Sequence, residues 1–245
     1  MGSTGFIECR NVVKSFDEKV VLRGLSLVID RGETMVILGG SGSGKTVLLK
    51  HMNGLMSPDS GEVFIDGWEV SGRGEDDLSE VRKRVAMVFQ GSALFDSLTV
   101  EENIAYPLME HTAWSSEKIR ARVGELLSLV GLEGSEELYP AEISGGMKKR
   151  ATLARALSLN PEGLLYDEPT TGLDPVMTQR INQTISNLQS KLGVTSVVVT
   201  HDLHSAFAVA DRLAFLHGGR IEFVGTRDEF RGSSDPALQE FLHAG

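Results

Sequence analysis

The sequence has little cysteine and no long apolar segment. Cys9 is the single cysteine in 245 residues, which excludes an intramolecular disulfide framework. No run of about 18 apolar residues occurs, and the first residues lack the basic start and apolar stretch of a secretory signal. We therefore expect no membrane-spanning helix and no secretory leader. Cations are also scarce: 24 Lys and Arg against 34 Asp and Glu give a net charge of −10, which argues against tight non-specific binding of nucleic acid.

Strand-like and helix-like stretches alternate along most of the chain. Residues 6–13 and 20–29 alternate polar and apolar side chains, as the strands of a half-buried antiparallel sheet do. Helical spacing dominates residues 98–160. Short apolar runs typical of buried strands occur at 34–38, 85–89, 163–166 and 194–199. This order predicts an α/β core interrupted by a helical insert.

Glycine is abundant, at 27 residues, and a glycine-rich motif lies between the apolar run at 34–38 and a helix-like stretch at 45–53. The motif fits G-x-x-x-x-G-K-[ST], in which backbone N–H groups and a helix N-terminus surround phosphate. Lys45 would place its charge at the β and γ oxygens, and the Thr46 hydroxyl would ligate Mg²⁺. A glycine-rich turn without a ligand is the alternative, which the flanking strand and helix disfavour. The predicted phosphate-binding residues are Gly39, Gly40, Ser41, Gly42, Ser43, Gly44, Lys45 and Thr46.

Two adjacent acids, Asp167 and Glu168, follow the apolar run at 163–166. Neighbouring carboxylates at a strand end repel each other unless a cation lies nearby, and nucleotide-bound Mg²⁺ would supply that charge. In such a site Asp167 would orient Mg²⁺ through water, and Glu168 would polarise the attacking water as general base. Taken alone, the pair is better explained as two solvated acids in a turn. Its position after a phosphate loop favours a two-part site for a nucleoside triphosphate.

A third motif, Ile143-Ser144-Gly145-Gly146-Met147, precedes a basic helix start and an Ala/Leu-rich helix. With this motif the chain resembles the ABC transporter ATPase family over almost its whole length. The family signature reads L-S-G-G-Q, so the first and last positions differ here. Ser144 and the two glycines remain, and these are the groups that would touch phosphate at a helix N-terminus. The resemblance implies an α/β fold of the ABC ATPase type: a RecA-like P-loop NTPase core with an antiparallel β subdomain and an α-helical insert.

The resemblance also divides the chain and assigns further residues. It implies a single ABC ATPase domain, with the nucleotide-binding core at 1–92 and 160–225, the helical signature subdomain at 93–159 and a short helical extension at 226–245. Phe16 would stack on adenine, Gln90 would sense Mg²⁺ and the membrane partner, and His201 would contact the γ-phosphate and position water. The expected sites are Lys45, Gln90, Glu168 and His201 for catalysis; Phe16, the loop residues 39–46, Val47, Ser144, Gly145, Gly146 and Asp174 for ATP; and Thr46, Gln90 and Asp167 for Mg²⁺.

The same resemblance implies a pair of chains. In this family the phosphate loop of one subunit faces the serine-glycine signature of another, so each ATP bridges two subunits. Asp174 belongs to the segment that communicates between them. Loss of the γ-phosphate contacts on hydrolysis would switch the pair from closed to open. With one phosphate loop and one signature, this chain is expected to form a homodimer.

The residues from Phe89 to Leu108, with the signature helix and the stretch 166–175, resemble the Mla-type phospholipid transport ATPases of Gram-negative bacteria. This branch implies a permease pair, an MCE-domain substrate-binding protein and a STAS-domain protein, at the cytoplasmic face of the inner membrane. An importer ATPase for a polar solute such as an amino acid is the alternative. We expect residues 94–108 beside the membrane partner, although their apolar side chains could instead pack internally. Likewise, Phe241 and Leu242 would contact a partner ATPase or pack on their own chain.

Two other classes fit the sequence less well. ABC-type proteins that clamp nucleic acid usually carry a long coiled-coil insert or two fused ATPase units, and neither fits in 245 residues. We therefore expect no nucleic-acid partner. A nucleotide-binding scaffold without hydrolysis is disfavoured because both Glu168 and His201 are present. His201 and His204 lack further nearby ligands of the kind a zinc site requires.

Overall fold

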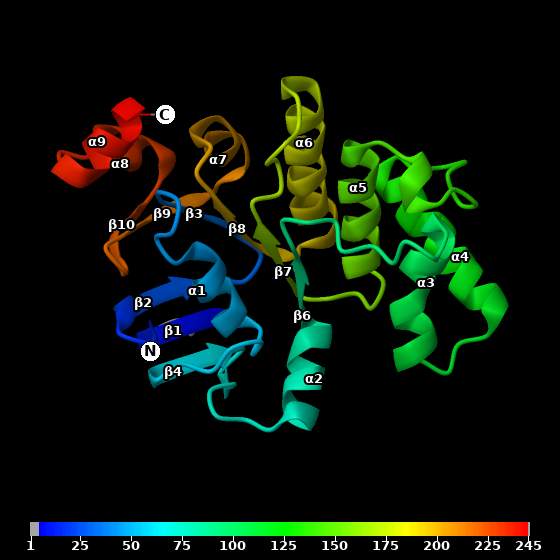
Figure 1. Cartoon of the computed structure of the whole chain (residues 1–245), viewed down its shortest axis with the longest axis horizontal. Coiled ribbons are helices and arrows are strands. Elements are labelled where there is room, and N and C mark those ends of the chain that lie inside the picture. The colour runs from blue at the N-terminus through cyan, green and yellow to red at the C-terminus, as the bar shows by residue number, and fades with distance from the viewer. Residues whose placement is uncertain (1–4, 245) are drawn as a thin grey trace.

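The computed structural model describes residues 5–244, which are arranged around two β-sheets (Figure 1). The smaller sheet is antiparallel, in the order β2-β1-β4-β5, and its strands are β1 Ile7–Phe16, β2 Lys19–Ile29, β4 Ser60–Ile65 and β5 Trp68–Glu69. Leu25, Leu27 and Ile29 of β2 are buried, while the residues between them are exposed. This alternation confirms the predicted antiparallel pairing of the first two strands.

The larger sheet has six strands in the order β10-β9-β3-β8-β7-β6. All neighbours are parallel except β10, which pairs antiparallel with β9 at one edge. Every residue of β3 and β7 is buried, which explains why both appear as short, mostly apolar runs. The strands are β3 Thr34–Leu38, β6 Val85–Val88, β7 Gly163–Asp167, β8 Thr195–Thr200, β9 Arg212–His217 and β10 Arg220–Gly225. Their parallel direction brings the carboxyl ends together at one edge, where open α/β sheets bind ligands.

Helix α1 (Lys45–Met52) follows β3 after the loop at 39–44 and packs between the two sheets. Leu48, Leu49 and Met52 are fully buried and belong to the same apolar cluster as side chains from β1, β2 and β4 and from one face of the larger sheet. The start of α1 is therefore held at the carboxyl edge of β3.

A second apolar cluster covers the opposite face of the larger sheet. It includes side chains from α6 (Pro175–Leu192), α7 (Leu203–Val209), α8 (Arg227–Gly232) and α9 (Pro236–Ala244). Phe241 of α9 lies against Phe215 of β9, with ring centroids 5.2 Å apart. Phe241 and Leu242 thus pack on their own chain, which was one of the two alternatives expected for them.

Residues 98–160, all of them described, contain helices and no strand, as predicted. The helices α3 Val100–His111, α4 Ser116–Val130 and α5 Gly145–Ala156 form a group at the right of Figure 1, and a short 3-10 turn over Pro140–Glu142 precedes α5. Each α-helix is capped by a hydroxyl side chain, those of Thr99, Ser115 and Ser144. Between this group and the antiparallel sheet lies α2 (Glu75–Arg84).

Among the described residues, no helix combines the length and the apolar character needed to cross a membrane. Of the helices in residues 5–244, α6 is the longest, and its exposed surface carries charged and amide side chains.

Candidate active site

The phosphate loop connects the end of β3 to the start of α1. Gly44 has φ of 107°, and a Cβ atom there would lie 3.1 Å from side-chain carbons of Val21 and Leu22. A Cβ atom on Gly39 would lie 2.5 Å from the carbonyl oxygen of Leu216. Glycine is therefore required at both ends of the loop, once by conformation and once by close approach of another strand. The hydroxyl of Ser43 is buried inside the loop without a hydrogen-bond partner in the described structure.

Lys45 points back into the loop that precedes it. Its Nζ donates to the carbonyl oxygens of Gly39, at 2.8 Å, and Gly40, at 3.1 Å, and its side chain is 7% exposed. The ammonium group is thus held at the centre of the loop, with backbone N–H groups and the positive end of α1 around it. This arrangement is suited to an anion such as phosphate.

Thr46 and Asp167 form a pair of oxygen ligands beside the loop. The Thr46 hydroxyl donates to Asp167 Oδ1 at 2.9 Å. Burial raises the pKa of Asp167, and the neighbouring carboxylate of Glu168 raises it further, while the Thr46 hydrogen bond opposes the shift. A hydroxyl and a carboxylate placed this close are ligands that Mg²⁺ prefers, and a divalent cation would compensate the buried charge. The donor set therefore fits Mg²⁺.

Glu168 lies directly after β7 and is surrounded by polar groups. Its Oε1 is 3.5 Å from Lys45 Nζ, and His201 Nδ1 lies 3.1 Å from Oε1 and 3.0 Å from Oε2. The hydroxyls of Thr171 and Thr200 each lie 3.3 Å from Oε2. Glu168 also has φ of 48°, a conformation that residues other than glycine adopt uncommonly and that often occurs at functional sites.

One cavity of about 840 Å³ borders Lys45, Thr46 and Glu168. This volume lies within the range of small-molecule sites. The predicted residues Gly39, Ser43 and Asp167 are not among those that line it. The predicted residues Phe16, Val47, Gln90, Glu168 and His201 line it together with most of the phosphate loop. Val21 of β2 and Phe241 of α9 also line it, and sequence reasoning missed both. Nothing in the local sequence marks either residue, because each reaches the cavity only through the packing of its own element.

The signature residues lie elsewhere on the molecule. Ser144 caps α5 through a bond from Met147 N, and Asp174 caps α6 through bonds from Val176 N and Met177 N. The residues that line the cavity do not include Ser144, Gly145, Gly146 or Asp174. The folded chain therefore brings together Phe16, Gln90, Glu168, His201 and most of the phosphate loop at one cavity. It leaves the signature residues and Asp174 outside that cavity.

Comparison with known proteins decides the family. The family model described as "ABC transporter" matches residues 22–171, which is more than half of the chain and includes the phosphate loop, the signature and the acidic pair. The chain belongs to the ABC transporter family. It is an ATPase of that family, with the mixed α/β fold of its ATP-binding cassettes.

Two curated ABC relatives resemble the chain over most of its length. It is 39% identical to the "Intermembrane phospholipid transport system ATP-binding protein MlaF" of Escherichia coli strain K12, over 96% of this chain and 88% of that protein. It is 40% identical to the "Probable ribonucleotide transport ATP-binding protein mkl" of Mycobacterium tuberculosis strain H37Rv, over 97% of this chain. The chain spans 66% of the length of that mycobacterial relative.

A solved ABC structure supports the fold. It is described as a "Dimeric structure of a post-hydrolysis state of the ATP-binding cassette MJ0796 bound to ADP and Pi". It matches with a TM-score of 0.83 and 35% identity, over 90% of this chain and 98% of that chain.

Proposed function

We propose that this chain binds and hydrolyses MgATP as one of two ATPase subunits that energise phospholipid transport through a membrane permease. The observation that carries the catalytic part is the position of Glu168. Its carboxylate lies between Lys45 and His201 and directly beside the Thr46–Asp167 ligand pair. In this proposal Glu168 would serve as the base, Lys45 as the cation for phosphate, and Thr46 with Asp167 as metal ligands at the edge of the cavity.

Each residue has a role in this proposal that follows from its position. The loop amides and Lys45 would bind the β and γ phosphates, and Phe16 would stack on the base. Thr46, Asp167 and Gln90 would hold Mg²⁺, which when bound neutralises charge on the phosphate oxygens. His201 would orient the attacking water, and the Glu168 carboxylate would accept its proton.

The second half of each ATP site would come from another copy of the chain. Ser144 and Asp174 lie outside the cavity, at the beginnings of α5 and α6. The solved cassette is dimeric and bound to ADP and Pi, which supports a pair of copies. In that pair the signature of one copy would close the phosphate loop of the other. We therefore propose a homodimer with two composite sites.

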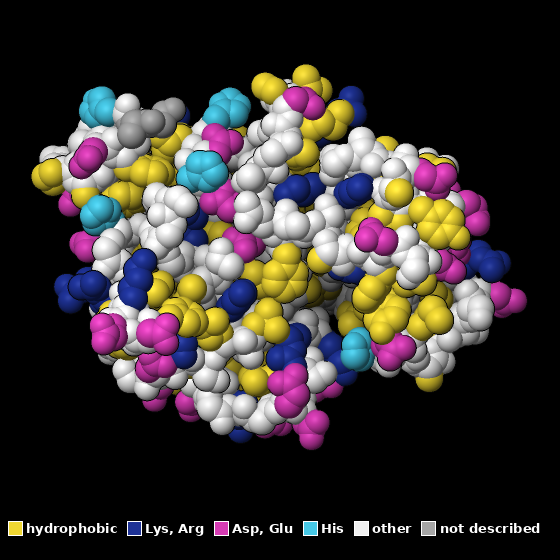
Figure 2. All heavy atoms as spheres, viewed as in Figure 1, with side chains coloured by type: hydrophobic (Ala, Val, Ile, Leu, Met, Phe, Trp, Pro, Cys, Tyr) yellow, Lys and Arg dark blue, Asp and Glu magenta, His cyan; other side chains and the backbone are white. Residues whose placement is uncertain are grey.

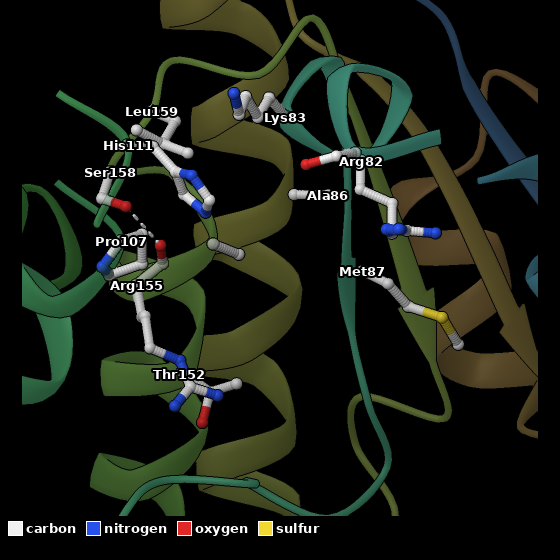
Figure 3. Close-up of a pocket in the computed structure, with 12 residues that line it drawn as sticks. Arg82, Lys83, Ala86, Met87, Pro107, His111, Thr152, Arg155, Ser158 and Leu159 are labelled. Atoms are coloured by element: carbon white, nitrogen blue, oxygen red, sulfur yellow. Dashed lines mark hydrogen bonds between the residues drawn. The ribbon is translucent and has the colours of Figure 1, made fainter. Parts of the chain in front are cut away.

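The permease would dock in a groove beside the helical group. The groove has a volume of about 240 Å³ and lies between α2 and β6 on one side and α3 and α5 on the other (Figure 3). Arg82, Lys83, His111 and Arg155 line it, and on the face shown in Figure 2 cations and a histidine border a hollow in this region. Arg82 and Lys83 are paired with Glu75 and Glu80 of the same helix, so an acidic permease segment would compete with these carboxylates for the two cations.

The segment predicted beside the membrane partner is divided in the structure. Leu94 and Leu98 are partly buried, whereas Phe95 and Tyr106 are exposed and contact each other, with ring centroids 5.0 Å apart. These two aromatic rings would extend the docking surface. Leu94 instead packs against the chain's own core.

The phospholipid part of the proposal rests on the relative named MlaF, which the chain matches over 88% of that protein's length. In that branch the partners would be a permease pair, an MCE-domain protein and a STAS-domain protein, at the cytoplasmic face of the inner membrane. A polar solute is the second candidate, because the relative named mkl carries a ribonucleotide transport name at similar identity.

One experiment separates the two substrates. The chain is purified with its membrane subunits, reconstituted, and assayed for phosphate release with added phospholipid or with added ribonucleotide or amino acid. The proposal expects phospholipid co-purification and stimulation of hydrolysis by phospholipid. Stimulation by a polar solute alone would favour the second candidate, and co-purification with ribosomes or DNA would contradict both.

A further inference from the structure

One face of α5 holds the backbone of the segment that follows β6. Lys149 Nζ donates to the carbonyl oxygen of Gln90 at 2.8 Å. Arg155 Nη2 donates to the carbonyl oxygen of Ala93 at 2.8 Å, and the Thr152 hydroxyl donates to the carbonyl oxygen of Ser92. We call Lys149, Thr152 and Arg155 the α5 ladder. They are spaced by three residues, so they lie on one face of the helix.

The segment held by the ladder lies outside the sheet. β6 ends at Val88, and Gln90 follows in a loop that lines the nucleotide cavity. Ala93 has φ of 45°, which is strained for a residue with a Cβ atom. Three side-chain donors from another element therefore fix a short loop with an unfavourable backbone conformation. The position of Gln90 depends on where α5 lies.

The ladder connects three regions of the molecule. At its start, α5 carries the signature Ser144. Thr152 and Arg155 line the groove between β6 and α5, where Figure 3 shows them on the side opposite Ala86 and Met87. Lys149, the ladder residue nearest the start of α5, bonds the residue that lines the nucleotide cavity. The backbone position of Gln90 is thus tied to the position of α5.

Burial and two nearby carboxylates act on the pKa of Lys149 in opposite directions. Burial lowers the pKa of Lys149, and the carboxylates of Asp167 and Glu168 are close enough to oppose that shift. The ladder therefore brings a cation from the helical group toward the acidic pair at the end of β7. Thr152 is 3% exposed, and its hydroxyl also lies 2.9 Å from the carbonyl oxygen of Lys148, so the carbonyl oxygens of Ser92 and Lys148 share this one donor.

We propose that Lys149, Thr152 and Arg155 are positioning residues that set the location of Gln90 in the nucleotide cavity. This inference rests on the proposed function, because it assigns a role to Gln90 in Mg²⁺ binding. Displacing a catalytic group by about 1 Å can reduce turnover about a hundredfold. Loss of ladder bonds should therefore affect turnover and Mg²⁺ dependence more than ATP affinity.

The test uses the double variant Lys149→Met/Thr152→Val, which removes two donors and keeps similar volume. The matched control is Lys149→Arg/Thr152→Ser, which keeps both donors. Each is purified with the membrane subunits, and ATP affinity, kcat, the Mg²⁺ concentration for half-maximal rate and the melting temperature are measured. We expect the donor-free variant to bind ATP within about twofold of wild type, to lose about tenfold in kcat and to need several-fold more Mg²⁺. The control should restore both values.

Unchanged kcat and Mg²⁺ dependence in the donor-free variant would overturn the proposal. The proposal would also be overturned if kcat and the melting temperature both fell while the Mg²⁺ dependence stayed unchanged, because that result would show a purely structural role. If the double variant does not fold, Lys149→Met alone is judged by the same criteria, because Lys149 is only partly buried. Failure of the proposed function is seen separately, as absence of ATP hydrolysis in the wild-type complex.

Discussion

The Nζ of Lys45 lies 3.5 Å from Oε1 of Glu168, and both side chains are largely buried. The same ammonium also donates to the carbonyl oxygens of Gly39 and Gly40. A phosphate in the loop would compete with the carboxylate for this cation. Binding of ATP would thereby release a carboxylate that can accept a proton. The geometry thus links phosphate binding to the availability of the base.

The first prediction concerns that base. Glu168→Gln removes the proton acceptor but keeps the size of the side chain, so turnover should fall at least about a hundredfold while ATP binding persists and the ATP-bound dimer accumulates. Phosphate release and size-exclusion chromatography with MgATP measure the two effects. Glu125→Gln, on the exposed surface of α4, is the matched control. Undiminished hydrolysis in Glu168→Gln would refute the assignment.

The second prediction concerns the loop cation. Lys45→Ala removes charge-assisted bonds to phosphate, so ATP affinity should fall roughly 10- to 100-fold. A titration with a fluorescent ATP analogue measures this loss. Lys191→Ala changes an exposed lysine at the end of α6 and should leave affinity unchanged. Equal affinity of wild type and Lys45→Ala would contradict the phosphate role.

The third prediction concerns the composite site. Ser144→Arg places a long charged side chain at the start of α5, outside the cavity, so a single chain should still bind ATP while turnover falls roughly a hundredfold. Mixing Ser144→Arg with Lys45→Ala chains gives mixed dimers that contain one site with an intact loop and an intact signature. Phosphate release should partly recover in the mixture. Full activity of Ser144→Arg alone would rule out the two-chain site.

The fourth prediction concerns pH and an ion-pair network between the two sheets. Arg31 and Arg84 lower the pKa of Asp66, and Arg84 and Arg31 lower the pKa of Glu162. Carboxylates with a lowered folded pKa stabilise the protein above their unfolded pKa of about 4, and this contribution disappears as the pH falls through the lowered value. Because solvent screens these partly exposed groups, Arg84→Gln should lower the free energy of unfolding by only about 0.5–1 kcal/mol at pH 7.

Urea unfolding at several pH values measures this contribution. The difference between wild type and Arg84→Gln should shrink steadily below about pH 4. Arg120→Gln on α4 changes an arginine whose side chain is 78% exposed, and it should show little effect at any pH. A difference that stays constant from pH 7 to pH 3 would show that the network does not act through these carboxylates.

The fifth prediction concerns a buried amide in α3. The Asn103 side chain is fully buried, its two N–H hydrogens are shared among the carbonyl oxygens of Phe95, Leu98 and Thr99, and its Oδ1 accepts from Phe95 N. Asn103→Ala leaves these groups unpaired, so the free energy of unfolding should fall by roughly 2–4 kcal/mol. Asn187→Ala, in an exposed pair on α6, should change it by less than about 0.5 kcal/mol. Equal stability of the two variants would show that water replaces the lost bonds.

The structure departs from the sequence analysis mainly where residues act through distant contacts. Phe241 was expected either at a partner ATPase or in internal packing, and it packs on Phe215 while also lining the nucleotide cavity. The bond from Lys149 to Gln90 joins residues 59 positions apart in the chain. No local pattern marks such a contact, because hydrogen bonds between side chain and loop depend on how the elements pack.

By itself, the sequence determined the parts of this protein that are built from neighbouring residues. The phosphate loop and the acidic pair each need contiguous residues at a strand end, so glycine spacing and apolar runs are sufficient to predict them. Only the tertiary structure decided how these parts meet. The order β3-β8-β7-β6 places strands that are far apart in the chain side by side, and this brings Lys45, Glu168 and His201 together. The physical reason is that a parallel sheet aligns the carboxyl ends of its strands, whatever their order along the chain.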